Sequence, residues 1–394
     1  MEGRDETVDL RILVLFGNIP LLGKERANIQ VLRVLKEHGA KVLFATHKEW
    51  GHESIQPMLD SVGLDWKPMA AARPLRRAMG IRDLVLVARD LIVGWWELIQ
   101  MIRHFRPTHI HVPNEYQSVY NIPVLAASGV PIVYRLGDAP VETPWFLREL
   151  WSRLVVPNVS RFVCVSEYIR GRLLDTGAAP EKVDVIYSYP PARLADRTLV
   201  GVPPFEGRTG LYIGQIAEHK GVDLLVESAI EICRARDDVR FLIAGDYTWQ
   251  NSFAEALIER VESLGLSDRI QFLGFVEDVP GLLAATDIHM CPSVWEEPLS
   301  NTVVEAKRSG VPSIVFSSGG LPELIEHEVD GWICDAKTAE SLKYALDRML
   351  ALPDSALHTM AEEAQASMER LGITKAAFTD AWVEVYQQAA KAGH

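Results

Sequence analysis

Short apolar runs alternate with longer helical stretches along nearly the whole chain of 394 residues. Most of these runs are continuously apolar, which is typical of strands that helices cover on both faces. A repeated order of strand, helix and strand favours parallel sheets with right-handed crossovers. We therefore predict an α/β protein of doubly wound sheets. The predicted strands are RILVLFG, KVLFATH, THIHVPN, PIVYRL, RFVCVSE and KVDVIYS, then GLYIGQ, RFLIAGD, RIQFLGF, IHMCPS, PSIVFS and GWICD.

The chain is too long for one ordinary hydrophobic core, so two domains are expected. Residues 190–208 contain four prolines and two glycines and show no helical or strand period, so they mark the boundary. We predict domains at 1–200 and 201–375, with a last helix at 376–394 that packs back on the first domain. Open parallel sheets bind ligands beyond the carboxyl ends of their strands. Two such sheets with facing loops predict a ligand-binding cleft at the boundary.

The composition is that of a soluble globular protein, with 48% hydrophobic and 24% charged residues. A net charge of −13 without a basic stripe argues against nucleic acid as the main partner. The N-terminus carries charges where a signal peptide needs an apolar segment, and the four cysteines stand far apart in apolar runs. We expect a cytoplasmic protein with buried free thiols.

Basic residues gather within 73–106. The apolar stretch LVLVARDLIVGWWELIQMI lies in this region, but Arg89, Asp90 and Glu97 interrupt it. It therefore predicts a buried or surface-lying helix rather than a membrane span. Two interpretations stay open for the basic residues: a solvated helical face, or a peripheral contact with the inner face of the membrane. The residues are Arg73, Arg76, Arg77, Arg82, Arg89, Arg103 and Arg106.

The segment MCPSVWEEPLSNTVVEAKRSGVP, residues 290–312, is the strongest candidate for chemistry. It predicts a strand, a loop and then a helix that begins around Pro298–Ser300, since proline is favoured early in a helix. N–H groups near Leu299, Ser300 and Asn301 would form an anion site at the helix start.

A carboxylate stands on each side of this anion site, at Glu297 and Glu305. Both can accept hydrogen bonds from hydroxyl groups. Eight helical residues rise about 12 Å, roughly the reach from sugar to ribose across a diphosphate. Two ordinary solvated glutamates are the alternative interpretation of this spacing.

The same segment resembles the E-x7-E motif of glycosyltransferase family 4, which contains retaining enzymes with the two-domain GT-B fold. Three further blocks resemble this family in the same order. YIGQIAEHKGVDLLVES is similar to its phosphate-binding strand, loop and helix, FLGFVEDVPGLLAATDIHMCPS to the stretch that lines the base, and SSGGLPELIEHEVDGWICD to its glycine-rich closing segment. The resemblance implies two Rossmann-like domains facing across a cleft, with 1–200 on the acceptor side and 201–375 binding a nucleotide sugar.

The resemblance also implies roles for single residues. Glu297 would hold the hydroxyls of the donor sugar, and Lys220 would stabilise the departing nucleotide as a cation beside a developing anion. Glu305 would hold the ribose. The other implied donor-binding residues are Gly23, Gln215, Phe275, Pro298, Leu299, Ser300, Asn301, Gly319 and Gly320.

Some positions depart from the family pattern. Gln215 stands where arginine is usual, so one phosphate cation is missing, and His219 would compensate only when protonated. The resemblance is weaker in the first half of the chain. There, THIHVPNEY resembles a strand end that presents a histidine to the reacting sugar, which implies a catalytic role for His111. A structural histidine is the alternative there. RLGDAP replaces a segment in which a His-Asp pair is frequent and leaves Asp138 as a catalytic candidate.

The resemblance thus implies a retaining transfer from a nucleotide diphosphate sugar, with a UDP-sugar favoured, to a hydroxyl acceptor. The acceptor would be a glycan, a lipid-linked glycan or a small molecule. We expect no cofactor and no metal, since the chain has no aspartate pair at D-x-D spacing. A nucleotide-sugar epimerase and a catalytically silent nucleotide-sugar-binding protein remain alternatives. An oxidoreductase fits the β–α pattern, but no GxGxxG follows the first strand.

Overall fold

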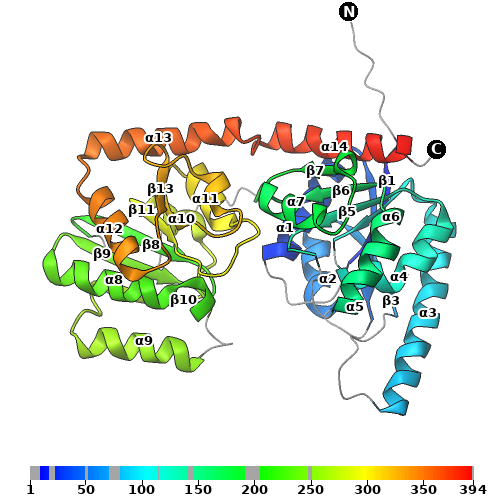
Figure 1. The fold of residues 1–394 in the computed structure, drawn as a ribbon, viewed down its shortest axis with the longest axis horizontal. Helices are drawn as coiled ribbons and strands as arrows, with labels where there is room; N and C mark the ends of the chain where they lie inside the picture. Colours follow the sequence, from blue (N-terminus) through cyan, green and yellow to red (C-terminus); the bar gives the residue numbers. More distant parts are fainter. Residues whose placement is uncertain are drawn as a thin grey trace, which may run out of the picture. The chain divides into compact units, whose positions relative to one another are not determined.

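The structure is a computed structural model that describes residues 9–16, 23–48, 52–70, 80–113, 115–140, 145–190, 205–246 and 251–392. The chain forms two compact units (Figure 1). Unit 1 comprises Met1–Tyr187 and Lys375–His394, and unit 2 comprises Ser188–Thr374. Most of the expected boundary segment, residues 191–204, lies outside the described residues.

Unit 1 is built on a seven-stranded parallel sheet in the order β3-β2-β1-β4-β5-β6-β7. Six of its strands match the predicted ones, and β3 is the addition. The strands are β1 Arg11–Leu15, β2 Lys41–His47, β3 Asp65–Met69, β4 His109–Val112, β5 Ile132–Leu136, β6 Arg161–Cys164 and β7 Val183–Val185.

The helices of unit 1 include the last helix of the chain. α14 packs against β4, β5, β6 and α1, so this late segment completes the core of the first unit (Figure 1). The helices are α1 Gly23–Glu37, α2 His52–Ser61, α3 Ile81–Phe105, α4 Glu115–Ser128, α5 Trp145–Leu150, the π-helix η1 Trp151–Val155, α6 Val156–Asn158, α7 Glu167–Leu174, the 3-10 helix η2 Pro180–Lys182 and α14 Lys375–Ala392.

Unit 2 is built on a six-stranded parallel sheet in the order β10-β9-β8-β11-β12-β13. All six strands match predicted ones. They are β8 Arg208–Ile213, β9 Val239–Ala244, β10 Ile270–Gly274, β11 Ile288–Cys291, β12 Ser313–Phe316 and β13 Gly331–Cys334.

Helices and short 3-10 turns follow the strands of unit 2 (Figure 1). They are η3 Glu218–Lys220, α8 Val222–Ala235, α9 Asn251–Ser263, α10 Val279–Ala284, α11 Asn301–Arg308, η4 Leu321–Leu324, α12 Ala339–Leu350 and α13 Asp354–Arg370.

Both faces of the unit 2 sheet are buried, as its continuous apolar strands predict. Consecutive residues of a strand point to opposite faces. Phe241 belongs to the core layer that holds Leu225 of α8 and Leu346 of α12. Leu242, the next residue, belongs to the layer that holds Ala306 of α11.

A buried ion pair fastens α11 to the rest of unit 2. Lys307 is fully buried, and its Nζ donates to Asp330 at 2.6 Å and to Ser367 of α13 at 2.8 Å. Burial lowers the pKa of Lys307 while the Asp330 carboxylate opposes that shift. Breaking such a pair from one side leaves an uncompensated buried charge. The C-terminal end of α11 is therefore held against Asp330 and α13.

Candidate functional site at the ends of β8 and β11

The order of strands in unit 2 reverses between β8 and β11, which are neighbours in the sheet. At such a switch point the loops after the two strands diverge and leave room for a ligand beyond their carboxyl ends. The loop after β8 contains η3, and the loop after β11 leads into α11. The predicted motifs YIGQIAEHKG and PSVWEEPLSN occupy these two loops.

The two loops touch closely because one position lacks a side chain. Gly221 has φ +68°, and a Cβ built on it would lie 2.0 Å from the carbonyl oxygen of Pro292. Only glycine fits that conformation and that contact. The carbonyl of His219 then accepts hydrogen bonds from the N–H groups of Val294 at 3.1 Å and Trp295 at 3.0 Å.

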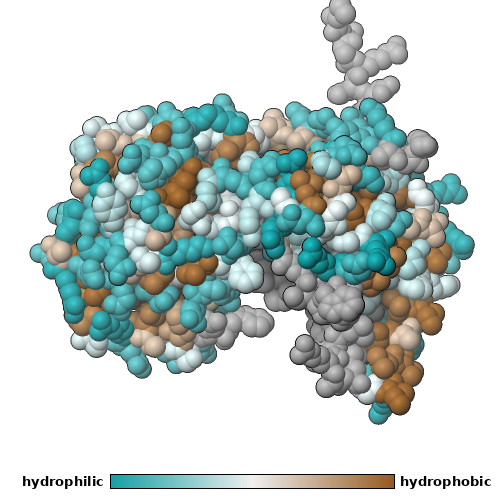
Figure 2. Space-filling model, viewed as in Figure 1, coloured by the Kyte–Doolittle hydropathy of each residue, from teal (hydrophilic) through white to brown (hydrophobic). Residues whose placement is uncertain are grey.

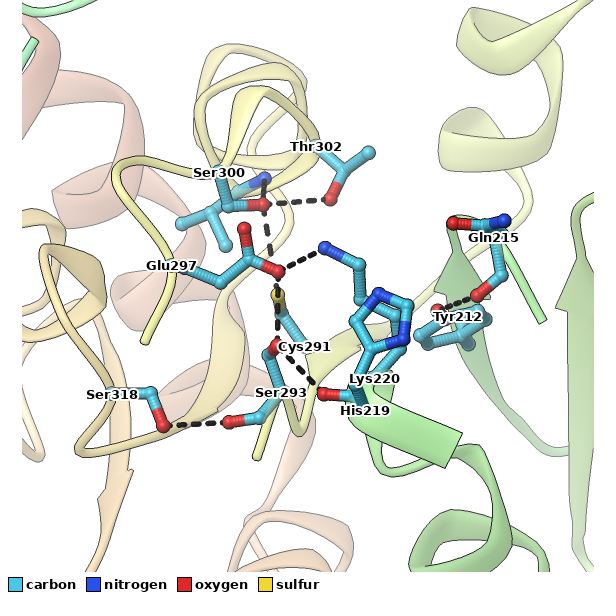
Figure 3. A network of polar contacts seen from close by, with 11 residues as sticks. Tyr212, Gln215, His219, Lys220, Cys291, Ser293, Glu297, Ser300, Thr302 and Ser318 are labelled. Carbon is cyan, nitrogen blue, oxygen red and sulfur yellow. Dashed lines mark hydrogen bonds and ion pairs between the residues drawn. The ribbon is translucent and has the colours of Figure 1, made fainter. Parts of the chain in front are cut away.

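An ion pair between Lys220 and Glu297 joins the ends of these loops (Figure 3). Ser293 also donates its hydroxyl to Oε1 of Glu297 at 2.9 Å. The Glu297 side chain is 11% exposed and that of Lys220 25% exposed, so the pair is mostly but not fully shielded from water. Within the described part of the chain both bonds reach Oε1, which leaves Oε2 as the acceptor for a further hydroxyl.

The glycine-rich turn after β12 lies against the backbone of Glu297. Gly319 has φ +56°, and a Cβ there would lie 2.1 Å from the Glu297 carbonyl oxygen. Gly320 donates its N–H to the same oxygen at 2.7 Å. A side chain at position 319 would displace the turn or Glu297. The structure thus brings Lys220, Glu297, Gly319 and Gly320 together, and their roles toward a donor stay predictions.

Helix α11 begins at Asn301, later than the predicted Pro298–Ser300. Ser300 is its N-cap, in extended conformation, and its Oγ accepts from the N–H of Val303 at 3.4 Å. Residues 297–300 are therefore not helical, and the 12 Å estimate for eight helical residues is wrong. Glu305 lies buried within α11, while Pro298 and Leu299 are half-buried in the approach to it.

Two contacts around Glu297 were missed from the sequence. Ser293 stands two residues after the end of β11, and its proximity to Glu297 follows from the loop conformation alone. Glu296 accepts from the N–H of Gly319 at 2.6 Å and from Lys337 at 2.7 Å, so it ties the glycine turn to the loop. Lys337 and the Gly319 N–H hold the pKa of Glu296 below its usual value against the opposing effect of burial. A second acidic residue beside Glu297 was the available signal.

Three other residues that the sequence singled out lie in unit 2. Gln215 is exposed, and its main-chain carbonyl accepts a hydrogen bond from the hydroxyl of Tyr212 at 2.8 Å (Figure 3). Burial, and then the charge of Lys220, lower the pKa of His219, so this imidazole is neutral at pH 7. It therefore does not replace the charge that arginine would carry at position 215. Phe275 is 66% exposed directly after β10.

Unit 1 has its own switch point, between β1 and β4. His111 of β4 is fully buried there, and its Nδ1 lies 2.8 Å from the Tyr386 hydroxyl of α14. Its ring centroid lies 5.7 Å from that of Trp382. Burial, with a smaller effect of Arg135, lowers the pKa of His111 to about 3. This geometry favours the structural interpretation of His111, and a catalytic role stays a prediction.

Asp138, another predicted residue of unit 1, lies near a buried guanidinium. Burial lowers the pKa of Arg135 to about 10, and the charges of Asp138 and Glu25 oppose that shift. Asp138 therefore shares the electrostatic environment of Arg135 just after β5. Gly23 begins α1, and the rest of the glycine-containing loop, residues 17–22, lies outside the described residues.

Three further observations concern the whole described chain. The four cysteines are buried and free, as expected. Among residues 9–392, apart from the undescribed gaps, no histidine, cysteine, aspartate and glutamate side chains cluster in a way that could hold a metal ion. Across the same described residues, none of the helices combines the length and the apolar character needed to cross a bilayer.

Two family descriptions match the chain. Glycosyltransferase Family 4 matches residues 23–188, and Glycosyl transferases group 1 matches residues 204–367. The chain is 29% identical over 238 residues to the putative glycosyltransferase YtcC of Bacillus subtilis (strain 168), which covers 55% of this chain and 58% of YtcC. The chain spans about half the length of the curated relatives it matches.

Solved structures match over nearly the full length. A glycosyltransferase from Rickettsia africae ESF-5 has a TM-score of 0.82 at 18% identity and covers 97% of this chain and 99% of its own. Anabaena Alr3699/HepE in complex with UDP has a TM-score of 0.78 at 19% identity, with coverage of 95% and 99%. HepE has also been solved with UDP-glucose. These similarities confirm the predicted α/β fold class.

Proposed function

The chain belongs to glycosyltransferase family 4, and from this premise we propose that it transfers a sugar from a nucleotide diphosphate sugar to a hydroxyl acceptor. We further propose that the transfer retains the anomeric configuration and needs no metal ion. The donor would bind at the loops after β8 and β11, where Lys220, Glu297 and the start of α11 meet.

The observation that carries this proposal is the Lys220–Glu297 pair at the switch point of unit 2. An ammonium group has three N–H donors, so Lys220 can hold Glu297 and a phosphate oxygen together. Oε2 of Glu297 would accept from a sugar hydroxyl. The two side chains thus offer adjacent subsites for the diphosphate and the sugar.

The departing nucleotide gains negative charge as the bond to the sugar breaks. A fixed cation and the N–H groups at a helix start stabilise such a charge without reorganisation during the reaction. Lys220 and the first turn of α11 would supply this stabilisation in place of a metal. The acceptor hydroxyl would approach from the leaving-group face and give its proton to a phosphate oxygen, which retains the configuration.

We propose that uracil is the base of the donor nucleotide. HepE, whose fold this chain shares, has been solved with UDP and with UDP-glucose. The exposed ring of Phe275 at the end of β10 offers an apolar surface for a base. The acceptor would be a glycan, a lipid-linked glycan or a small molecule with a free hydroxyl.

A thermal-shift comparison of UDP-, GDP- and ADP-glucose tests the donor site, because a ligand that binds the native state raises its stability. We expect UDP-glucose to raise the melting temperature most. Glu297→Gln should remove most of the extra shift of UDP-glucose over UDP, since it alters the sugar subsite. Equal shifts for wild type and Glu297→Gln with every sugar donor would contradict this placement of the site.

Stereochemistry and turnover need a second measurement. Proton NMR of the first product formed from UDP-glucose and an acceptor panel should show the α-anomer. A β-linked product would refute the proposed retention.

A catalytically silent binding protein is the second candidate function. One observation favours it. Gln215 carries no charge and the lowered pKa of His219 disfavours its charged form, so Lys220 is left as the cation of the loop after β8. Calorimetric binding of UDP-glucose without turnover on any acceptor would support this alternative. Installing the usual charge with Gln215→Arg should then raise donor affinity.

A further inference from the structure

Helix α3 carries apolar side chains on two opposite faces. Val87, Gly94, Leu98 and Met101 are buried against unit 1, as expected for a helix that covers a sheet. On the outer side Ile81 is 84% exposed, Val85 62%, Ile92 65% and Trp96 62%. A helix that is apolar all round is normally enclosed by other apolar groups. In the described structure this outer face has no such cover.

The exposed residues form one continuous stripe. Positions 81, 85, 92 and 96 are separated by four, seven and four residues, which places them one above another on a helix. Leu84 and Val93 are exposed beside them. Figure 2 shows apolar surface gathered over this end of α3, in the same view as Figure 1. Contiguous exposed apolar surface of this kind marks an interaction site.

The charges of α3 divide by sign. The exposed positions include Arg82, Arg89 and Arg103, which lie near the stripe at helical spacing. The acidic residues are turned to partners within unit 1, because Asp83 accepts from the N–H of Gly80 at 3.0 Å and Glu97 from that of Ala70 at 2.6 Å. Asp90 is buried and accepts from Arg89 at 2.6 Å. The outer face thus offers apolar groups and positive charge together.

This pairing fits the surface of an anionic bilayer. An interfacial helix buries its apolar residues at the level of the acyl chains while its basic residues contact lipid phosphates. Tryptophan is favoured at that depth because its ring is amphipathic. The length and apolarity needed to span a bilayer are absent from the described helices, which is compatible with a helix lying in the interface.

A second copy of the chain fits the same face less well. In an antiparallel pairing of two α3 helices centred near Val93, the middle of the helix, Arg82 of one copy would approach Arg103 of the other. Like charges brought together in this way cost free energy unless acidic groups separate them. The acidic groups of α3 are engaged elsewhere, as described above.

We propose that the outer face of α3 docks on an anionic lipid bilayer. The stripe of Ile81, Val85, Ile92 and Trp96 would enter the interface, and Arg82 and Arg103 would contact phosphate groups. Arg73, Arg76 and Arg77, which the sequence also suggested for such a contact, lie outside the described residues. Joined to the proposed transferase function, this docking would bring unit 1 to a lipid-linked acceptor.

Sedimentation with vesicles tests the docking. The full chain should bind vesicles of phosphatidylglycerol and phosphatidylcholine in equal parts and bind pure phosphatidylcholine far more weakly. The double variant Ile92→Ser/Trp96→Ser should lower the partition coefficient at least about tenfold, because two apolar side chains no longer leave water. Arg82→Gln/Arg103→Gln should lower it about tenfold or more on anionic vesicles, with a reduced dependence on salt.

Matched variants in unit 2 provide the controls. Tyr344→Ser removes an aromatic side chain that is 57% exposed on α12, and Arg234→Gln removes an exposed cation of α8. Both should bind anionic vesicles as the wild type does. Circular dichroism and melting curves confirm that each variant is folded.

Two results would overturn the proposal. One is wild-type binding that does not distinguish anionic from neutral vesicles, or that survives both α3 variants unchanged. The other is a dimer in sedimentation velocity that Ile92→Ser/Trp96→Ser converts to a monomer, which would assign the face to a second copy. The assay contains no donor or acceptor, so its failure leaves the proposed transferase function untouched.

Discussion

The two units place different side chains at the same point of the same fold. Each sheet reverses its strand order at a central pair, β1 and β4 in unit 1 and β8 and β11 in unit 2. After β11 the Lys220–Glu297 pair remains partly open to water. On β4 the His111 ring is closed off by Tyr386 and Trp382 of α14.

The difference shows that a switch point offers room for a ligand but does not decide its use. In unit 2 the loops that follow the strands carry the polar groups, and a glycine at position 221 brings these loops together. In unit 1 a helix from the end of the chain covers the strand itself. The chemistry at each switch point therefore depends on which segments cover the strand. Residues far away in the sequence determine that cover.

The largest effect that we expect is a difference in kcat between variants at the two switch points. Lys220→Met should lower kcat by about 10² to 10³, the usual cost of one fixed donor at a developing negative charge. His111→Gln should leave kcat within about threefold, because its burial against Tyr386 and Trp382 favours a structural role. Initial rates with the donor identified by thermal shift provide the comparison.

Lys343→Met is the matched control for Lys220→Met. Lys343 also forms an ion pair in unit 2, with Asp347 at 2.6 Å, and lies on α12. Its loss should not change kcat. Equal losses of kcat for His111→Gln and Lys220→Met would break the comparison and make His111 a catalytic residue.

Acid should weaken unit 1 through His111. The folded pKa of His111 is lowered to about 3 from an ordinary 6.5. The unfolded chain therefore binds the proton more readily, and the stability that His111 contributes is present above about pH 6.5 and is lost as the pH falls toward 3. Between pH 7 and pH 5 this loss is about 2 kcal/mol for one such group.

Hydrogen exchange of peptides that contain β4, at pH 7 and pH 5, measures this loss as opening free energy. In His111→Gln the difference between the two pH values should shrink by about that amount, since glutamine does not titrate. The exposed His38 of unit 1 provides the control, and His38→Gln should behave as the wild type. An unchanged pH dependence in His111→Gln would show that this ring is not buried as a neutral group.

The fold followed from the sequence because burial on both faces leaves a continuous apolar signal. All twelve predicted strands correspond to observed ones, and β3 alone was missed among the described strands. Its sequence is DWKPM, a strand at the edge of the sheet with three exposed residues and a proline. An edge strand needs neither an apolar run nor a full set of N–H donors, so it leaves little trace in a sequence.

The site followed from the sequence only in part. Glu297 and Lys220 were found because motifs place them, but the ion pair between them was not predicted. The contacts of Ser293 and Glu296 depend on loop conformation, which no periodic pattern encodes. The burial of His111 depends on α14, whose packing residues stand 271 and 275 positions later in the chain. A local sequence pattern does not show which distant residues will bury a given side chain.

The glycine turn sharpens the comparison within unit 2. Gly319→Ala should destabilise the protein by about 1–2 kcal/mol more than Gly372→Ala. Both residues have positive φ, at +56° and +67°, so both alanines are strained in the same way. Only the Cβ at 319 meets another atom within 4 Å, the carbonyl oxygen of Glu297 at 2.1 Å. Urea unfolding measures the difference, and donor affinity should fall in Gly319→Ala alone.

The smallest effect concerns the Glu296–Lys337 pair, which ties the turn from outside. Its side chains are 52% and 28% exposed, and exposed pairs contribute about 0–1 kcal/mol. Glu296→Gln and Lys337→Met should each raise the donor KM about two- to fivefold and leave kcat nearly unchanged, because they loosen the turn without touching the reacting atoms.

A double-mutant cycle tests whether Glu296 and Lys337 affect the donor KM through their contact with each other. The KM effects of Glu296→Gln and Lys337→Met should be less than additive, with a coupling of about 0.2–1 kcal/mol, since each change breaks the same contact. A purely electrostatic role of Lys337 toward the donor would give additive effects instead. That result would place Lys337 beside Lys220 as a second cation of the site and remove Glu296 from the positioning of the turn.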